Sequence, residues 1–244
     1  MAGAKSPNLM GNSWFQFQQF RIEQDRCGMK ISTDAVLLGA LAKHPSPGAI
    51  LDIGTGTGVI ALMLAQRFEN SQVSAVELDP DAAGQALENF QNSPFSSRLS
   101  LWEGKFQEFH SDGLFDLIVS NPPYFTDHLR PKDQQRKLAL HTDDLTFQEL
   151  VEGVDQLLAV EGQFWVILPL SEMEKLIWFF DPFGIFPFAS IQIQDRPGKN
   201  PHRVICGFQR RKDSVKEEFI SLKDEKGGFS PTYRKLISGF LLGY

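Results

Sequence analysis

The feature that most constrains the fold of this 244-residue chain is a regular alternation of short apolar runs with longer amphipathic stretches. The apolar runs predict five β-strands, over Ala49–Ile53, Gln72–Val76, Arg98–Trp102, Phe115–Ser120 and Gln163–Leu168. The amphipathic stretches predict helices over Val59–Phe68, Asp81–Phe90 and Phe147–Leu158. Strands and helices that alternate at this spacing are joined by right-handed crossovers. The sequence therefore predicts an α/β fold that is Rossmann-like, with a doubly wound, mostly parallel sheet.

Two flanks lie outside this alternation. The first begins with a hairpin or extended segment around Phe15–Ile22, followed by a helix over Ser32–Leu41 with its cap among the first three residues. The second contains two antiparallel strands, a further strand and a last helix, expected over Phe186–Ile193, Val204–Phe208, Phe219–Leu222 and Pro231–Phe240. We expect a flexible N-terminus over residues 1–14 and a single domain over residues 15–244, with residues 15–45 as an N-terminal cap.

The composition of the chain excludes several classes of protein. The two cysteines, Cys27 and Cys206, lie far apart in the sequence, which excludes a disulfide scaffold and a four-cysteine zinc module. The five histidines show no paired ligand spacing, so no metal site is expected. No apolar run approaches the roughly 18 residues that span a bilayer, and we expect a cytoplasmic protein with no membrane contact.

The charge of the chain is unevenly distributed. The formal net charge of −6 argues against non-specific adhesion to nucleic acid. Between Arg196 and Lys212, however, there are six basic residues and no acidic one. This basic run is the strongest candidate for a local contact with phosphates, and its alternative interpretation is a solvated face.

A glycine-rich loop, Gly54–Gly58, follows the first strand of the alternation and opens the first crossover helix. A nucleoside binds at this end of a parallel sheet, where glycines allow close backbone approach. A dinucleotide fingerprint requires its third glycine at position 59, which is Val59 here. Asp52 before the loop suits a cationic amino-acid group better than a pyrophosphate. Glu77, which closes the next strand, can accept hydrogen bonds from ribose hydroxyls.

A second motif follows the fourth strand directly, as Asn121-Pro122-Pro123-Tyr124. The two prolines fix φ and remove two backbone donors, so the carbonyls of Asn121 and Pro122 can face a ligand. With the Asn121 amide oxygen, they complement the two hydrogens of a planar exocyclic amino group. Tyr124 offers a ring on which a base can stack. Positioning of such a nitrogen can supply much of the rate, so no catalytic histidine or cysteine is required.

With both motifs in place, the sequence resembles the Rossmann-like S-adenosylmethionine-dependent methyltransferases that act on amino groups. The resemblance implies S-adenosylmethionine as the cofactor and Gly54–Gly58 as its loop. Within that loop and the neighbouring strand ends, the expected cofactor contacts are Asp52, Gly54, Thr55, Gly56, Gly58, Glu77, Leu78 and Asn121. Many members of the family bind the adenine amino group through an acidic residue just after the third strand. Here either Glu103 or backbone groups make that contact.

Three further stretches narrow the resemblance. Phe20–Gly39 looks like the N-terminal signature of the bacterial tRNA N6-adenine methyltransferases that modify the adenine just 3′ of the anticodon in a valine tRNA. Arg136–His141 and Pro201–Val204 look like later blocks of that family, so the resemblance covers nearly the whole chain. It implies that Asn121–Tyr124 bind the target base. The residues it implies for the methionine end of the cofactor are Lys30, Thr33 and Asp34.

The expected partner is accordingly a tRNA anticodon loop. A base in such a loop must be splayed out before its N6 can be reached, and unstacking costs a few kcal/mol. Aromatic and phosphate contacts are therefore expected around the motif. The candidates for contact with the RNA are Phe125, Arg196, Lys199 and Arg203. We expect the protein to act as a monomer.

Three alternative functions stay open at this point. The first is methylation of guanine N2 in ribosomal RNA. The second is methylation of glutamine N5 in a protein, although those enzymes carry a sizeable helical domain ahead of the glycine loop, and here the loop begins at Gly54. The third is a noncatalytic RNA-binding module, which the intact loop and the intact Asn121–Tyr124 motif disfavour.

Overall fold

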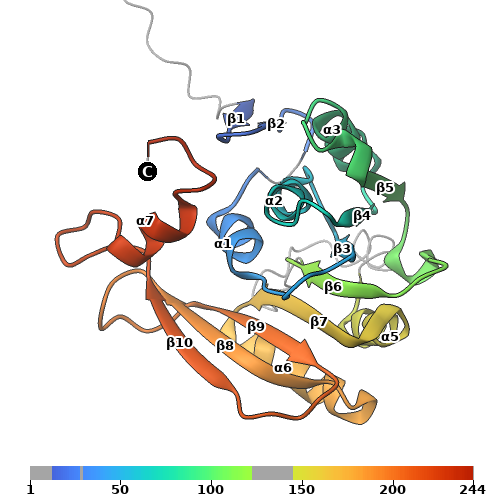
Figure 1. Ribbon diagram of the computed structural model, residues 1–244. Helices are drawn as coiled ribbons and strands as arrows, with labels where there is room; N and C mark the ends of the chain where they lie inside the picture. The colour runs from blue at the N-terminus through green and yellow to red at the C-terminus, as the bar shows by residue number, and fades with distance from the viewer. Residues whose placement is uncertain (1–12, 28–29, 123–144, 244) are drawn as a thin grey trace, which may run out of the picture.

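The computed structural model describes residues 13–27, 30–122 and 145–243, which form a three-layered α/β fold around one eight-stranded sheet (Figure 1). The strands of this sheet are β3 (Ala49–Ile53), β4 (Gln72–Glu77), β5 (Leu99–Glu103), β6 (Phe115–Ser120), β7 (Leu158–Leu168), β8 (Phe186–Gln194), β9 (Arg203–Gln209) and β10 (Lys216–Ser221). Their order across the sheet is β10-β8-β9-β7-β6-β3-β4-β5. The fold is therefore the doubly wound, mostly parallel architecture that the alternation predicts.

Helices cover both faces of the sheet. They are α1 (Thr33–Leu41), α2 (Val59–Arg67), α3 (Pro80–Gln91), α5 (Phe147–Leu157), α6 (Leu170–Phe180) and α7 (Pro231–Ile237), with short 3-10 turns at Ser96–Arg98, Phe106–Glu108 and Asp181–Phe183. Successive residues of a strand point to opposite faces. In β7, Trp165 and Ile167 thus pack in the core beneath α1, α2 and α7, whereas Phe164 and Val166 pack against α5 and α6. Two apolar faces explain why the strands are near-continuous apolar runs.

Strand direction defines one functional edge of the sheet. β8 and β9 pair antiparallel, as predicted, and β10 pairs parallel with β8, a pairing that the sequence did not specify. Within the sheet β9 runs against its seven companions. The carboxyl ends of the other strands, together with the beginning of β9, therefore meet at a single edge.

The largest differences from the sequence-based prediction are in α6 and β7. The helix α6 was missed, although Met173, Leu176 and Phe180 have helical spacing and are buried. The strand β7 begins at Leu158, earlier than predicted, because an irregular register beside β6 adds residues before its regular part. A Cβ added to Gly162 in that irregular part would lie 2.9 Å from the Phe115 carbonyl oxygen, so glycine is required there.

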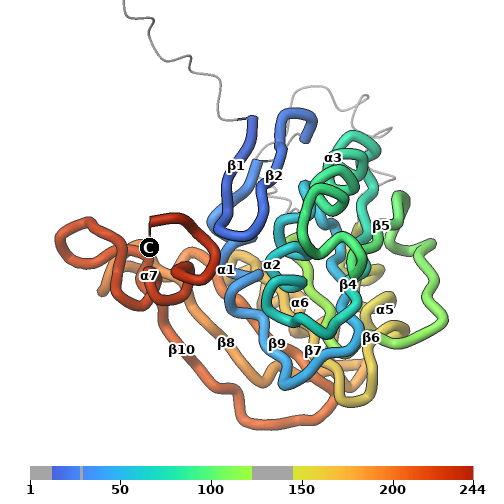
Figure 2. The backbone as a smooth tube through the Cα atoms, turned by 45° about the horizontal axis from the view of Figure 1, so that its top comes forward, coloured from blue at the N-terminus to red at the C-terminus, as the bar shows by residue number. Residues whose placement is uncertain are grey.

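The N-terminal segment forms an antiparallel hairpin, β1 (Trp14–Gln16) and β2 (Arg21–Glu23), beside α3 (Figure 2). Trp14, expected in a flexible N-terminus, is the first residue of this hairpin. The buried Phe17 pairs with Leu241, and the Gln18 N–H donates to the Phe240 carbonyl at 2.7 Å. The hairpin is thus held against the last described segment of the chain. Among the described helices, none has the length and apolarity needed to cross a membrane.

Candidate functional site

The glycine loop between β3 and α2 has the backbone conformation of a ligand cradle. Gly54, Gly56 and Gly58 have φ of 70°, 58° and 84°, the left-handed region that favours glycine. The end of β4 fixes the loop, because the Val76 carbonyl accepts hydrogen bonds from the Gly54 and Thr55 N–H groups at 2.9 and 3.0 Å. A Cβ added to Gly54 or Gly56 would meet no atom within 4 Å. The loop backbone therefore borders open space in which a ligand can lie.

Asp52 lies beneath this loop and is fully buried. Its Oδ2 accepts hydrogen bonds from the Thr55 hydroxyl at 2.6 Å and from the Ala61 N–H at 3.1 Å. Burial raises its pKa to about 7, and the negative charge of Glu77 acts in the same direction. Its Oδ1 is buried without a hydrogen-bond partner among the described residues. An unpartnered acceptor is costly, so Asp52 fits a ligand that brings a positively charged donor.

Glu77 ends β4 at the opposite side of the loop. Its carboxylate accepts hydrogen bonds from the Gly56 N–H at 2.7 Å and from the Asp79 N–H at 2.9 Å. Carboxylate oxygens have further lone pairs, so Glu77 can still accept from ribose hydroxyls. Glu103 lies in register beside Glu77 on β5 and is exposed, as is Leu78. The structure thus brings these three predicted cofactor residues together.

Asn121 leaves the sheet next to the glycine loop. β6 is the neighbour of β3, with Ser120 opposite Ile53, and the Ser120 hydroxyl donates to the Ile53 carbonyl at 3.0 Å. The next residue of each strand is Asn121 on one side and Gly54 on the other. Asn121 is half-buried and Pro122 is buried. The other expected base contacts, Pro123, Tyr124 and Phe125, lie outside the described residues.

The N-terminus of α1 lies at the same edge of the sheet. Its N-cap is Ser32, whose side chain accepts from the Ala35 N–H at 3.1 Å, and Lys30 and Thr33 nearby are exposed. The carboxylate of Asp34 forms an ion pair with the guanidinium of Arg203, the first residue of β9, at 2.7 Å. The sequence-based expectation places Asp34 at the cofactor and Arg203 at the RNA, and in the structure these two side chains are paired with each other.

The basic run of residues 196–212 is divided by β9. Arg196 and Lys199 are exposed in the turn before this strand, at the edge where the glycine loop lies, and Arg196 pairs with Asp195 at 3.2 Å. Arg210 and Arg211 follow the strand and pair with Asp155 and Asp213. The seven residues of β9 separate the two halves by about 20 Å at roughly 3.3 Å per residue. The run is therefore two separate groups at opposite edges.

Sequence reasoning missed two residues that join the site to its surroundings. Gln85 and Asn89 of α3 are both 1% exposed and lie four residues apart, on the helix face that also buries Ala86 and Phe90. The Asn89 amide nitrogen donates to the Thr57 carbonyl of the glycine loop at 2.9 Å. Two amides on an apolar helix face are the signal by which the sequence could have revealed them.

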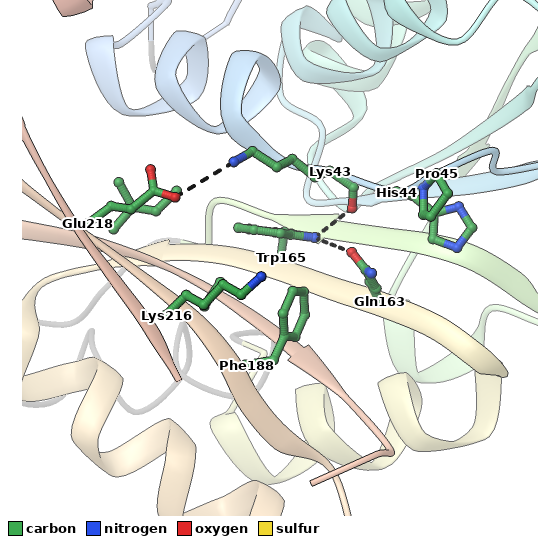
Figure 3. A pocket seen from close by; sticks show the side chains of 10 residues that line it. Lys43, His44, Pro45, Gln163, Trp165, Phe188, Lys216 and Glu218 are labelled. Carbon is green, nitrogen blue, oxygen red and sulfur yellow. Dashed lines mark hydrogen bonds and ion pairs between the residues drawn. The ribbon is translucent and has the colours of Figure 1, made fainter. Parts of the chain in front are cut away.

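A second hollow, of about 440 Å³, lies at the opposite edge of the sheet (Figure 3). Its walls come from the segment between α1 and β3 and from residues of β7, β8 and β10. The Trp165 indole N–H donates to the Lys43 carbonyl at 2.9 Å, and the Lys43 ammonium lies 4.0 Å from the Glu218 carboxylate. These contacts join α1 to the sheet, away from the glycine loop. The described residues bring together no group of three His, Cys, Asp or Glu side chains suited to a metal ion.

Solved structures with a similar fold are methyltransferases. The chain matches a predicted O-methyltransferase from Agrobacterium tumefaciens with a TM-score of 0.68 and 19% identity, over 85% of this chain and 96% of the other. It also matches the glycopeptide N-methyltransferase MtfA, complexed with S-adenosylmethionine, with a TM-score of 0.52 and 13% identity, over 69% and 90% of the two chains. At these identities the similarity establishes the fold.

Sequence comparisons are more specific. Residues 31–175 match the family model of the methyltransferase small domain. Relatives named tRNA1(Val) (adenine(37)-N6)-methyltransferase include one from Bacteroides fragilis, 41% identical over 96% of this chain and 99% of its own length. Another, from Photorhabdus laumondii, is 37% identical over 98% of this chain and all of its own length. The chain therefore belongs to the family of tRNA1(Val) (adenine(37)-N6)-methyltransferases.

Proposed function

We propose that this protein transfers the methyl group of S-adenosylmethionine to the N6 atom of adenine 37, beside the anticodon of a valine tRNA. The observation that carries the proposal is the adjacency of Asn121 to the glycine loop at the ends of β6 and β3. The adjacency supports a role in which the amide of Asn121 acts next to the methyl donor bound at the glycine loop. The names of the full-length relatives supply the identity of the nucleotide.

The residues around the loop fit the proposed cofactor. The loop backbone with its three left-handed glycines allows close approach of the methionine part, and the free Oδ1 of Asp52 can accept from its ammonium group. Glu77 can accept from the ribose hydroxyls, with Leu78 and Glu103 beside it for the adenine. When bound, the cofactor supplies an activated methyl group. Oxygen acceptors and carboxylates are the groups that a cationic nucleoside requires.

Asn121 acts on the nucleotide that is methylated. The lone pair of an adenine amino nitrogen is delocalised into the ring, which makes it a poor nucleophile. An acceptor that holds the amino hydrogens keeps electron density on the nitrogen and orients it toward the methyl group. This role requires neither a strong base nor a metal. Asn121, the glycine loop and the N-terminus of α1 meet at one edge of a single sheet, and we propose that a monomer suffices.

The decisive experiment is methyl transfer from labelled S-adenosylmethionine to three separate acceptors, unmodified tRNA, ribosomal RNA and a release factor. Nucleoside or amino-acid analysis then identifies the product. N6-methyladenosine in tRNA, lost when adenine 37 is replaced, is the expected result. N2-methylguanosine or methylglutamine as the product would overturn the substrate, and cofactor binding with no transfer to any acceptor would overturn catalysis.

A matched pair of variants tests the role of Asn121. We expect Asn121→Ala to lower kcat by about 10²- to 10³-fold, as the loss of a positioned transition-state contact does. The dissociation constant of S-adenosylhomocysteine should stay within about twofold, a difference of roughly 0.4 kcal/mol. Asn70→Ala makes the same change at an exposed position and should leave both values unchanged. A cofactor affinity that falls in parallel with kcat would assign Asn121 to the cofactor alone.

A further inference from the structure

The side-chain amide of Asn89 bridges two parts of the site. Its Oδ1 accepts from the Glu23 N–H at 2.8 Å, and its Nδ2 donates to the Glu23 carbonyl at 3.0 Å. The same nitrogen donates its other hydrogen to the Thr57 carbonyl at 2.9 Å. Both N–H groups and the oxygen of this side chain are thus hydrogen-bonded. One residue of α3 joins the end of the N-terminal hairpin to the glycine loop.

Two neighbouring amides hold the chain beyond the hairpin. The Gln85 side-chain oxygen accepts from the Arg26 N–H at 3.0 Å. The buried Gln24 accepts from the Ile31 N–H at 3.0 Å. The first bond holds the backbone at Arg26, and the second holds it at Ile31, which follows Lys30 directly. The path of this segment is therefore set by buried side-chain amides.

Both ends of α3 contact the candidate cofactor site. Its N-cap, Asp79, donates its N–H to the Glu77 carboxylate. Near its other end, the Phe90 ring lies so close to Gly58 that a Cβ there would be 2.5 Å from the ring. α3 thus contacts the Glu77 carboxylate, the glycine loop and the N-terminal segment. It therefore fixes the positions of these three parts of the site relative to one another.

We propose that Asn89, assisted by Gln85, is a positioning residue that couples the N-terminal cap to the glycine loop and so holds the cofactor site in its binding-competent arrangement. The proposal rests on the proposed function only in the identity of the cofactor. A site that is assembled in only a fraction of molecules binds its ligand more weakly by that fraction. Loss of the amide bridge releases the cap, so cofactor affinity falls, whereas the chemistry of the loaded enzyme at Asn121 is preserved.

The test is calorimetric titration of the folded, full-length protein with S-adenosylhomocysteine. We expect Asn89→Ala to raise the dissociation constant by about tenfold, or 1.4 kcal/mol, and Gln85→Ala by a smaller factor. The stoichiometry of binding reports the folded fraction separately from the affinity. The backbone amides of Glu23, Arg26 and Ile31, which these side chains hold, should also exchange hydrogen faster in Asn89→Ala. In kinetic assays the KM for S-adenosylmethionine should rise, with kcat at saturation within about twofold of the wild type.

Glu88→Ala is the matched control. Glu88 lies next to Asn89 on α3 and pairs with Arg26 of the same segment, but both partners are exposed. Because exposed ion pairs contribute little, its dissociation constant should equal that of the wild type. An unchanged affinity in Asn89→Ala and Gln85→Ala, with lower thermal stability alone, would overturn the proposal. The titration needs no RNA, so its outcome does not depend on whether the acceptor is tRNA.

Discussion

At the scale of single residues, the site is dominated by two carboxylates of different character. Asp52 is buried and its pKa is raised to about 7, whereas Glu77 stands half-buried at the end of its strand. Negative charges brought this close favour protonation of the buried partner. A ligand with an ammonium group reverses that preference. We therefore expect the ionisation of Asp52 to be coupled to cofactor binding.

This coupling predicts a pH dependence of cofactor affinity. Below pH 7 Asp52 is protonated in the free protein, and binding of the ammonium group must release that proton. Affinity for S-adenosylhomocysteine should therefore increase between pH 5.5 and about 7 and level off above, with proton uptake by the buffer in calorimetry. Asp52→Asn should bind more weakly and show no such increase. A wild-type affinity that is constant over this range would remove Asp52 from the cofactor contacts.

The same carboxylate affects the stability of the ligand-free protein. The pKa of Asp52 is higher in the folded state than the value near 3.9 of an unfolded chain, so the folded state binds the extra proton. The free energy of unfolding should be highest, for this group, below about pH 4 and decrease as the pH rises to about 7. Urea unfolding at pH 5 and pH 8 measures the decrease, and Asp52→Asn should reduce it. An equal change in both proteins would assign it to other groups.

At the scale of elements, the sequence predicts the strand ends and helix starts, because these depend on local patterns. The junctions that carry the site, Ile53 to Gly54 and Ser120 to Asn121, lie where the strand patterns end, because each strand is a short apolar run with a clear stop. Thr146 is likewise a helix start, with a complete capping box. The parallel pairing of β10 was not predictable, because partner choice depends on contacts across the whole sheet.

Side-chain contacts between distant elements were also beyond sequence reasoning. Asp34 and Arg203 are 169 residues apart in the sequence. Each charged side chain could equally contact a ligand or form an ion pair, so the sequence does not show that they pair with each other. Asn89 stands out in the sequence only as an amide on an apolar helix face, and its partners in β2 and the glycine loop have no local pattern that points to it. The helix α6 was missed because its exposed face carries an apolar residue, Trp178, which is 71% exposed and obscures the amphipathic pattern.

The contact between α3 and the glycine loop gives a prediction at this scale. Gly58→Ala forces a left-handed backbone on alanine and places its Cβ 2.5 Å from the Phe90 ring. We expect a loss of about 2 kcal/mol or more in stability, with weaker cofactor binding. Gly84→Ala, within α3, has no atom within 4 Å of the new Cβ and should gain about 0.5–1 kcal/mol. Thermal unfolding of both variants checks the opposite signs, and a tolerated Gly58→Ala would contradict the close packing.

At the scale of the whole molecule, an acidic protein must bind a polyanion through a limited surface. The net charge is −6, so non-specific attraction to RNA is weak. The local arrangement of basic residues therefore determines where RNA can bind. Arg196 and Lys199 lie at the edge that carries the glycine loop, whereas Arg211 and Lys212 lie at the opposite edge. Only the first pair is placed to contact an RNA whose base reaches Asn121.

Two charge-matched double variants test this arrangement. Arg196→Ala with Lys199→Ala, and Arg211→Ala with Lys212→Ala, each remove two exposed positive charges from the chain. Each phosphate contact contributes about 0.7–0.9 to the slope of log affinity against log salt, so the first variant should reduce that slope by about 1.5 and weaken tRNA binding. The second variant should keep the wild-type slope, because its charges lie about 20 Å away along β9. Equal losses of tRNA affinity and of salt slope in both variants would show that binding depends on the total charge of the protein. The basic residues at the edge with the glycine loop would then make no specific contribution to RNA binding.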